Sequence, residues 1–411
     1  MNNAVMKTQT INTALMKMAV IFPFIEYIFT YTKLNFLTIS FAYVALMFVF
    51  GLMLFLKNGG AVRFIGWLPF CVCVAFNKFQ GSLSTFYMLM YMSSLFFMYE
   101  VYELDENFVT YLIRAVSVIA FAVAVGCIFQ KHFGAVYDRL ARFFFNASGL
   151  KLVKQMASYG AYSGFEYQPT AAGAAISIGI VGVWANIGQK KIKKAIVLAI
   201  MYYALLLTAK RGFVLLSIIV PLLVYYLNAS NNVIGKLGRA AGVVCVAVIV
   251  VFMYFYFSQS NNMLIFERLE RFSAETNMNK LTSGRTLLAK NAVELFRKNP
   301  IFGIGMGAFS RLYGTSVHNV YMQLLVETGI VGFLAFVIPA VYVLGITVKA
   351  AKMQKAAETD RIAITYALGF QMLFLTYSFS GNPLYNTQWI YLYFMACALA
   401  IKVYEKRVNI Q

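Results

Sequence analysis

Long apolar runs alternate with short polar connections along most of this chain. Twelve of the runs approach or exceed the roughly 20 residues that a helix needs to cross the hydrocarbon core of a membrane. The pattern predicts an all-α polytopic membrane protein with about twelve transmembrane helices. The expected spans are 14–32, 34–56, 61–77, 82–99, 108–130, 168–187, 192–209, 211–228, 240–258, 318–348, 362–380 and 385–402.

Two longer polar segments interrupt this pattern, at 131–167 and at 259–317. In the first, basic and aromatic residues mix between Tyr137 and Phe145, which is typical either of a helix lying flat at the lipid head groups or of a solvated loop. The expected division of the chain is therefore 1–258 with nine helices and the first outer loop, 259–317 as a loop domain, and 318–411 with three helices and a tail.

The second polar segment contains apolar residues at helical spacing, which predicts an amphipathic helix of about four turns. Thr282-Ser283-Gly284 is suited to cap its start, and Asn299-Pro300 should stop it. Gly303-Ile304-Gly305-Met306-Gly307 follows a helix and not a strand, so a nucleotide-binding loop is disfavoured. A tight backbone turn, or a close approach of backbone N–H groups to a ligand, is expected instead.

Lys and Arg cluster in several short connections, which fixes the expected orientation. If the N-terminus is cytoplasmic, all of these clusters fall on the cytoplasmic side, as the positive-inside rule requires. Both termini are then cytoplasmic and both long polar segments lie outside, whereas the acidic connection 100–106 gives no support. The basic connections are 57–63, 190–194, 236–239, 349–361 and 402–407.

The chain of 411 residues carries a net charge of +20 with only 12% charged residues. The positive-inside bias explains part of this charge, but the outer segments are basic too, which indicates an anionic substrate or lipid head group outside. Neither an Asp-x-Asp pair nor a Walker loop occurs. No metal, cofactor or nucleic-acid partner is therefore predicted, and the five cysteines, all in apolar runs, indicate no disulfide framework.

Three positions at the expected outer face could carry chemistry. His318, one of two histidines, stands where the second outer segment meets a span. A lone histidine is often structural, but Glu327 follows it in the same span, where an ionisable residue needs a partner or a cavity. Lys210-Arg211 forms an outer turn that could either snorkel to lipid phosphates or clamp a bound phosphate, and Arg285 could be a second clamp.

Four stretches resemble, in order and setting, the O-antigen ligase and O-antigen polymerase superfamily of bacterial membrane glycosyltransferases. They are Ala209-Lys210-Arg211-Gly212, Ser283-Gly284-Arg285, Asn299-Pro300 with the glycines that follow it, and His318-Asn319-Val320-Tyr321 with Glu327-Thr328-Gly329 downstream. The resemblance covers roughly residues 165–335. Lys210 departs from it, because small residues or serine are common at that place.

The resemblance implies a GT-C-like fold in the bacterial cytoplasmic membrane and an extracytoplasmic active site. The implied substrates are a glycan donor on undecaprenyl pyrophosphate and a glycan acceptor, with membrane lipids and a chain-length regulator protein as further partners. It implies Arg211, Arg285 and His318 as catalytic residues. Lys210, Arg311, Asn319, Tyr321 and Glu327 are expected to bind substrate.

The expected reaction is a metal-independent glycosyl transfer of hexosyltransferase type that inverts the anomeric carbon. His318 would act as base or orienter for the acceptor hydroxyl, and the two arginines would stabilise the departing pyrophosphate. A polymerase is favoured because polymerases are the more varied and widespread class. The motifs do not separate it from a ligase that moves the finished glycan to a lipid or protein acceptor. A flippase for lipid-linked sugars is the alternative from another class, but no repeated halves are visible.

Overall fold

The computed structural model describes residues 105–186, 191–227, 285–353 and 357–408, together with 65–76 and isolated residues before 103. Every element in these ranges is helical and none is a strand, which confirms the all-α expectation for this part of the chain. The predicted spans 14–32, 34–56, 82–99 and 240–258 lie almost entirely outside the described residues, so the total of twelve crossings stays a prediction.

The described elements follow the predicted spans closely. Predicted spans from 108 to 228 and beyond 318 each correspond to a helical element whose ends differ by a few residues, and the element at 318–348 is interrupted at Gly329. Two helices, α7 and α18, are long and apolar enough to cross a membrane, and α10 and α12 are shorter apolar helices. In chain order the elements are η1 (Ile65–Trp67), α4 (Leu68–Phe76), α7 (Glu106–His132), α8 (Gly134–Phe144), α9 (Ala147–Ser158), α10 (Pro169–Ala185), α11 (Lys191–Leu207), α12 (Arg211–Leu227), α16 (Arg285–Lys298), α17 (Ala308–Tyr313), α18 (Val320–Lys352), α19 (Glu358–Tyr377), η2 (Pro383–Tyr385) and α20 (Thr387–Val408).

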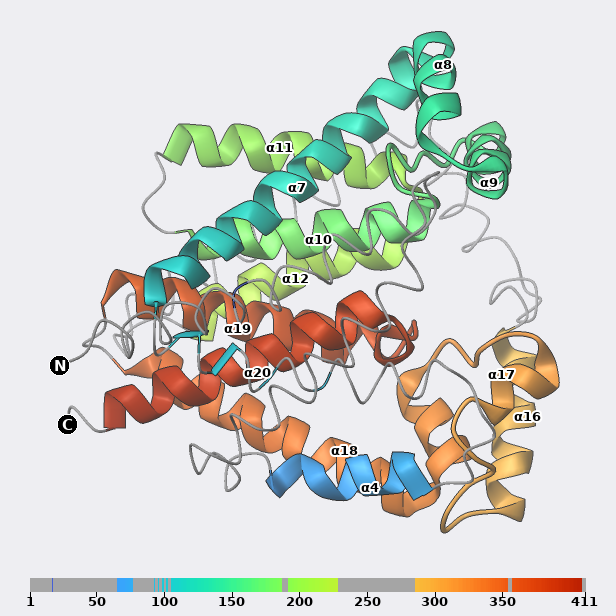
Figure 1. Cartoon of the computed structure of the whole chain (residues 1–411), viewed down its shortest axis with the longest axis vertical. Helices are drawn as coiled ribbons and strands as arrows, with labels where there is room; N and C mark the ends of the chain where they lie inside the picture. The colour runs from blue at the N-terminus through green and yellow to red at the C-terminus, as the bar shows by residue number, and fades with distance from the viewer. Residues whose placement is uncertain are drawn as a thin grey trace, which may run out of the picture.

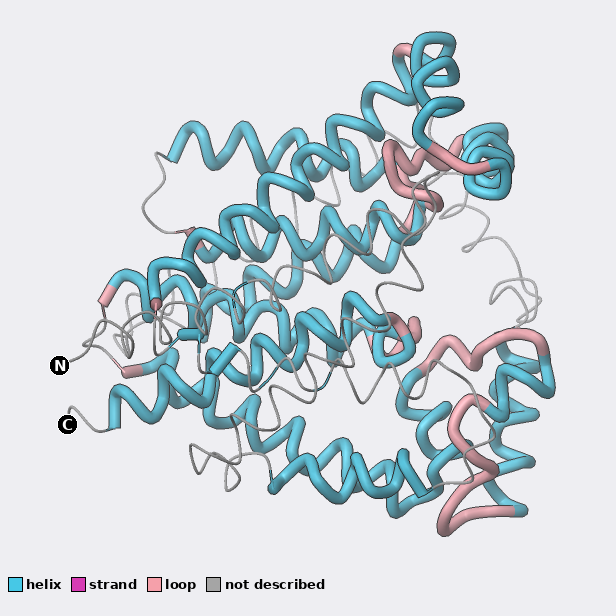
Figure 2. Tube along the Cα trace, in the orientation of Figure 1, coloured by secondary structure: helices cyan, strands magenta, loops and turns pink. Residues whose placement is uncertain are grey.

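The long helices form a bundle with its loops and short helices gathered at one end (Figure 1). α8 and α9 lie beyond the bundle at the upper right, and α16 and α17 at the lower right, whereas α20 ends and α7 starts at the left. Most of the described loops lie at the same right-hand end (Figure 2). This end corresponds to the two polar segments predicted to be extracytoplasmic, and we call it the outer end.

Small residues let α7 and α10 approach closely. A Cβ atom added at Gly179 would lie 2.1 Å from the Cβ of Ala120, and one added at Gly182 would lie 2.3 Å from the Ser117 hydroxyl. Lipid tails are as apolar as the side chains, so close backbone contact of this kind is what holds helices together in a membrane.

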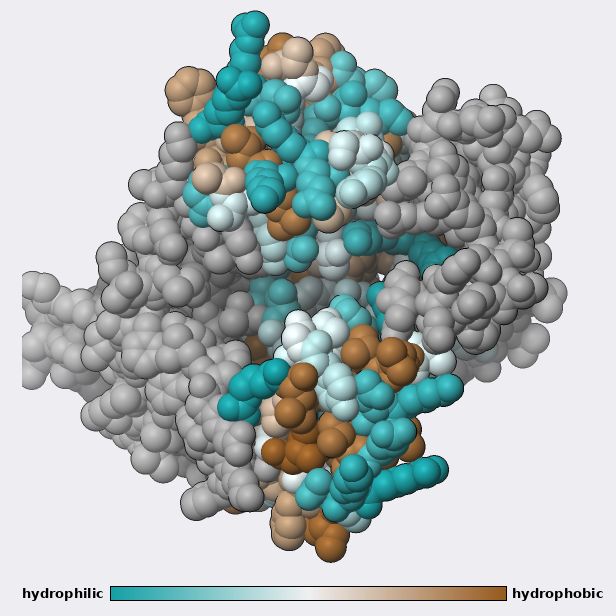
Figure 3. All heavy atoms as spheres, turned by 90° about the vertical axis from the view of Figure 1, so that its right-hand side faces the viewer, coloured by the Kyte–Doolittle hydropathy of each residue, from teal (hydrophilic) through white to brown (hydrophobic). Residues whose placement is uncertain are grey.

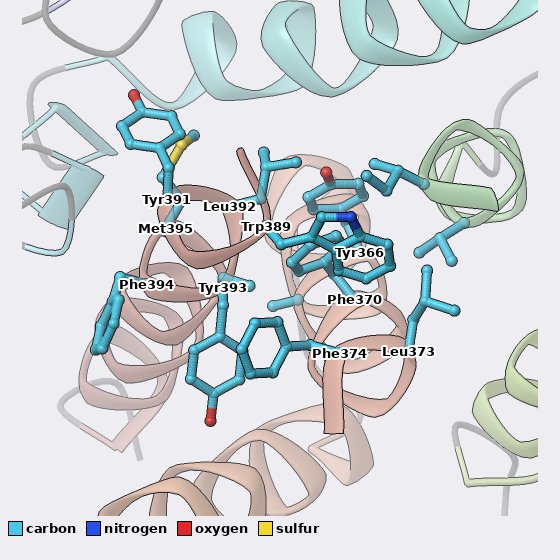
Figure 4. Packing of buried hydrophobic residues seen from close by; sticks show 14 of the residues in the cluster. Tyr366, Phe370, Leu373, Phe374, Trp389, Tyr391, Leu392, Tyr393, Phe394 and Met395 are labelled. Atoms are coloured by element: carbon cyan, nitrogen blue, oxygen red, sulfur yellow. The ribbon is translucent and has the colours of Figure 1, made fainter. Parts of the chain in front are cut away.

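Aromatic rings connect α19 to α20 (Figure 4), and a further ring pair connects α19 to α12. The rings of Phe374 and Tyr393 are stacked at 4.2 Å, and Trp389 lies 5.6 Å from Phe370 and 5.2 Å from Tyr377. Phe213 of α12 then meets Tyr377 at 4.5 Å. Because these rings are large and closely packed, they fix the last turn of α19 against the first turn of α12.

At the opposite end of the bundle, buried acids are paired with bases from distant helices. Asp360, only 3% exposed, accepts hydrogen bonds from the Tyr102 hydroxyl at 2.6 Å and from Lys406 Nζ at 3.2 Å. Lys406 also pairs with Glu106 at the start of α7. Glu106, at the end of the acidic connection that gave no support to the orientation, thus meets a basic residue near the C-terminus.

Candidate functional site

The sequence had indicated one continuous helix at 318–348. In the structure Gly329, with φ 65° and ψ −171°, interrupts α18. Segment 300–305 fills the interruption. Two N–H groups after the break donate to carbonyls of this segment at 2.9 and 3.3 Å, and two carbonyls before it accept N–H groups from it, both at 2.9 Å. These four backbone groups beside the break are therefore paired, as burial requires.

The two glycine motifs noted in the sequence meet at this break. A Cβ atom added at Gly303 would lie 2.4 Å from the backbone carbonyl carbon of Glu327, and one added at Gly329 would lie 2.1 Å from the carbonyl oxygen of Ile301. Both glycines also have positive φ, which other residues rarely adopt. The Gly-x-Gly-x-Gly segment is thus the backbone partner of the Glu-x-Gly motif.

We expect Gly329→Ala to prevent stable folding, since the new Cβ would strain the backbone by about 1–3 kcal/mol and also clash with backbone atoms. Gly345→Ala is the matched control in the same helix, because a Cβ there meets nothing within 4 Å. Thermal unfolding of the detergent-purified proteins, followed by size-exclusion chromatography, compares the two. Equal stability of both variants would show that the break is not needed.

Glu327 is fully buried beside the break, with an exposure of 0%. One carboxylate oxygen accepts the Tyr385 hydroxyl at 2.6 Å, and the other accepts the Phe309 N–H at 3.3 Å and the Gln323 amide at 3.2 Å. The buried carboxylate therefore links α17, α18 and η2 through hydrogen bonds. A direct contact with substrate stays a prediction for this residue.

The backbone on both sides of His318 is held in place by side chains of α18. The Gln323 side-chain oxygen accepts the N–H of Val317 at 3.2 Å and the amide of Asn382 at 2.7 Å. Asn319 caps α18 by accepting the N–H of Met322 at 3.0 Å. His318 itself has φ 59°, a conformation that costs energy outside glycine and occurs preferentially at functional sites.

His318 lies just before α18 and is half-buried. Burial lowers the pKa of its imidazole below the usual value, and the charge of Arg285 lowers that pKa further. The imidazole is therefore neutral at pH 7 and able to accept a proton. The other histidine within the described residues, His132, contacts Tyr203 at 3.0 Å instead.

A turn that the sequence analysis missed, Tyr377 to Gly381, contacts Arg285 and the first residue of α18, close to His318 in the chain. We had assigned 362–380 to a span, but α19 ends at Tyr377. Arg285 donates to the carbonyl oxygen of Ser380 at 3.1 Å, and the N–H of Val320, two residues after His318, donates to the carbonyl oxygen of Ser378 at 2.9 Å. The Ser-Phe-Ser-Gly sequence of this turn was the signal available for it.

The turn before α12 lies close to the turn 377–381. Arg211 is the first residue of α12, and the Lys210 carbonyl oxygen accepts the N–H of Phe213 at 3.0 Å. A Cβ atom added at Gly212 would lie 4.0 Å from the Ser380 hydroxyl. Arg211 therefore sits at a helix N-terminus, where the helix dipole favours an anion.

Two further candidates lie at the edge of this group. Tyr321 donates its hydroxyl to the carbonyl oxygen of Leu375 at 2.8 Å, and its ring lies 4.6 Å from that of Phe379. Phe379 is 67% exposed. Arg311 is exposed in the last turn of α17. Viewed from the outer end, the described surface is hollowed between α8–α9 above and α16–α17 below, with hydrophilic atoms in the hollow (Figure 3).

Arg211 at the start of α12, Arg285 at the start of α16 and His318 just before α18 thus form the candidate site. Residues 196–337 match the O-antigen ligase family model. This match confirms the superfamily resemblance for a segment that contains Arg211, Arg285, His318 and the helix break. No curated protein matches the chain.

Members of the O-antigen ligase family are membrane proteins of glycosyltransferase type that act on lipid-linked glycans and their acceptors. The matched segment begins within α11 and ends within α18. The turn 377–381, which contacts both Arg285 and Val320, lies outside it. The site is thus built from the matched segment and from the α19–α20 connection.

Proposed function

We propose that this protein is a polysaccharide polymerase at the outer face of the bacterial cytoplasmic membrane. It transfers a glycan from undecaprenyl pyrophosphate to the hydroxyl of an acceptor sugar. The observation that supports the proposal is the turn 377–381, which accepts a hydrogen bond from Arg285 and from the N–H of Val320 near His318, and lies against Gly212 next to Arg211. Cations beside a neutral imidazole suit a reaction in which a hydroxyl attacks and a pyrophosphate leaves.

In the proposed mechanism, neutral His318 accepts the proton of the acceptor hydroxyl as its oxygen attacks the anomeric carbon of the donor. The bond from that carbon to the pyrophosphate oxygen breaks, and its electron pair leaves with the pyrophosphate. Arg211 and Arg285 bind the departing oxygens with their planar guanidinium groups, which match phosphate geometry better than an ammonium group does. A single displacement of this kind inverts the configuration at the anomeric carbon.

Lys210 and Tyr321 complete the proposed binding site. Lys210 adds a cation next to Arg211, directly before α12. Tyr321 lies against the exposed ring of Phe379, and this pair offers an apolar surface to a sugar ring. Asn319 and Glu327 would support the site by shaping the backbone on either side of His318 and of the break at Gly329.

A ligase is the second candidate, and the description of the matched family is compatible with it. A ligase would use the same donor chemistry but would move the finished glycan to a different acceptor. The flippase alternative is weakened by the family match, because the members are enzymes of glycosyltransferase type. The two enzymatic candidates differ in the acceptor alone, so a defined acceptor separates them.

The test is a reconstitution of the purified protein in nanodiscs with an undecaprenyl-pyrophosphate-linked repeat unit as the only glycan substrate. A polymerase should produce a ladder of lipid-linked chains from this substrate alone, and EDTA should leave the ladder unchanged. Products that appear only after addition of lipid A-core would establish a ligase instead. Loss of all products with EDTA, restored by magnesium or manganese, would contradict the arginine mechanism.

A further inference from the structure

One face of α8 carries a stripe of exposed apolar side chains. Phe133, just before the helix, and Val136, Leu140 and Phe143 follow one another at helical spacings of three and four residues, so they share a face. Their exposures are 58%, 52%, 46% and 80%. Single apolar residues are common on protein surfaces, but a continuous stripe with two phenylalanines marks a surface that is covered by something apolar.

The neighbouring face of α8 is fixed to the protein, so the stripe cannot turn inward. Tyr137 and Ala141 are 1% and 2% exposed and pack with Phe145 and Val153. The Tyr137 hydroxyl also donates to the carbonyl oxygen of Gly164. The basic and aromatic pattern noted in the sequence thus separates into a buried face and an outward apolar face.

Basic residues flank the stripe. Arg139 lies three residues after Val136 and four before Phe143, so it borders the stripe, and Arg142 is exposed next to it. The one acid of α8, Asp138, is paired with Lys154 at 3.9 Å. The exposed surface around the stripe is therefore positive, which suits the anionic head groups of lipids.

The position of α8 in the fold points to a bilayer as the covering surface. α7 is long and apolar enough to cross a membrane and ends at His132, and α8 begins at Gly134. Figure 1 shows α8 at the corner of the molecule, at a steep angle to α19 and α20. A helix that starts where a span ends, and that runs across the direction of the bundle, lies in the plane of the membrane surface.

We propose that α8 docks on the outer leaflet of the cytoplasmic membrane, with Phe133, Val136, Leu140 and Phe143 among the acyl chains and Arg139 and Arg142 at anionic phospholipid head groups. This docking also supports the candidate site. Tyr137 holds Gly164, and the N–H of Tyr162 donates to the carbonyl oxygen of Leu207 at 3.0 Å, directly before the turn that carries Arg211.

The test places a nitroxide spin label at each of the four stripe positions in turn, in a cysteine-free version of the full chain. The protein is reconstituted in bilayers of phosphatidylethanolamine and phosphatidylglycerol, and collisions of the label with oxygen and with a water-soluble nickel chelate are measured. Stripe labels should collide often with oxygen and rarely with nickel. A label at Ala135, exposed on the same helix but outside the stripe, is the matched control and should show the reverse.

Two results would overturn the docking. Frequent nickel collisions at all stripe positions would mean that the stripe faces water, and rare collisions with both reagents would mean that another protein or a second copy covers it. Neutralising Arg139→Gln and Arg142→Gln together tests the anionic part of the proposal. The label at Phe143 should then lie closer to water, and an unchanged depth would contradict a role for the head-group charge.

Discussion

Replacing His318 with asparagine is expected to lower the rate of glycosyl transfer by about 10²- to 10⁴-fold, the usual contribution of a general base. Asparagine tolerates the positive φ of this position better than alanine does, so the variant should fold. The measurement is the rate of ladder formation by purified protein in nanodiscs, with membrane content matched. Full activity of His318→Asn at pH 7 would remove His318 from the mechanism.

The same residue should set the acid limb of the pH profile. Its pKa is lowered, so kcat/KM should be constant near neutral pH and should fall as pH drops through a value below the ordinary 6.5 of histidine. Arg285→Gln removes a charge that lowers this pKa, so the acid limb should move to higher pH even though the overall rate falls. The shift should be partial, because burial is the larger cause. An unmoved limb would show that Arg285 does not act on His318.

Arg211→Lys and Arg285→Lys are each expected to reduce the rate by about 10²- to 10³-fold, as the loss of a transition-state donor does. Lysine keeps the charge but cannot bind two phosphate oxygens with a planar fork. If both arginines act on one bound pyrophosphate, the double variant should be little worse than the slower single variant.

Arg297→Lys is the matched control for these variants, since Arg297 is exposed at the far end of the same helix as Arg285. It should transfer glycan at the normal rate. Glycan chain length in cells that lack the native gene, with membrane levels checked by immunoblot, provides a second measurement. Normal polymer from both Arg→Lys variants would contradict the clamp and favour a transport role.

Patterns of short range in the sequence predicted the helices well. Apolar runs predicted the described helices between 108 and 228 and beyond 318 within a few residues, and Asn299-Pro300 correctly marked the end of α16 at Lys298. Such features depend on neighbours in the chain, which a single sequence contains. The sidedness of the bundle and the roles of the site residues remain predictions, because they depend on a membrane and a substrate.

Features built from distant parts of the chain could not be predicted in the same way. Gly329 lies inside a predicted span, and only the contact with segment 300–305 shows it as a break. The turn after Tyr377 was hidden at the end of an apolar run, although it joins Arg285 to α18. Tyr385 was read as the start of a span, yet its hydroxyl binds Glu327, 58 residues away in sequence.

The break at Gly329 also sets an order for the biogenesis of the protein. Away from water, each unpaired backbone group costs several kcal/mol, so α18 cannot remain in the membrane with its break open. Its partner, segment 300–305, precedes the break in the chain and therefore leaves the ribosome first. The outer segment and α18 can thus form as one unit during translation, whereas the bond from Tyr385 to Glu327 must wait for the hairpin of α19 and α20. Newly made protein should therefore pass through an inactive stage in which α18 is already inserted. This stage should end when the hairpin of α19 and α20 inserts and packs against α18.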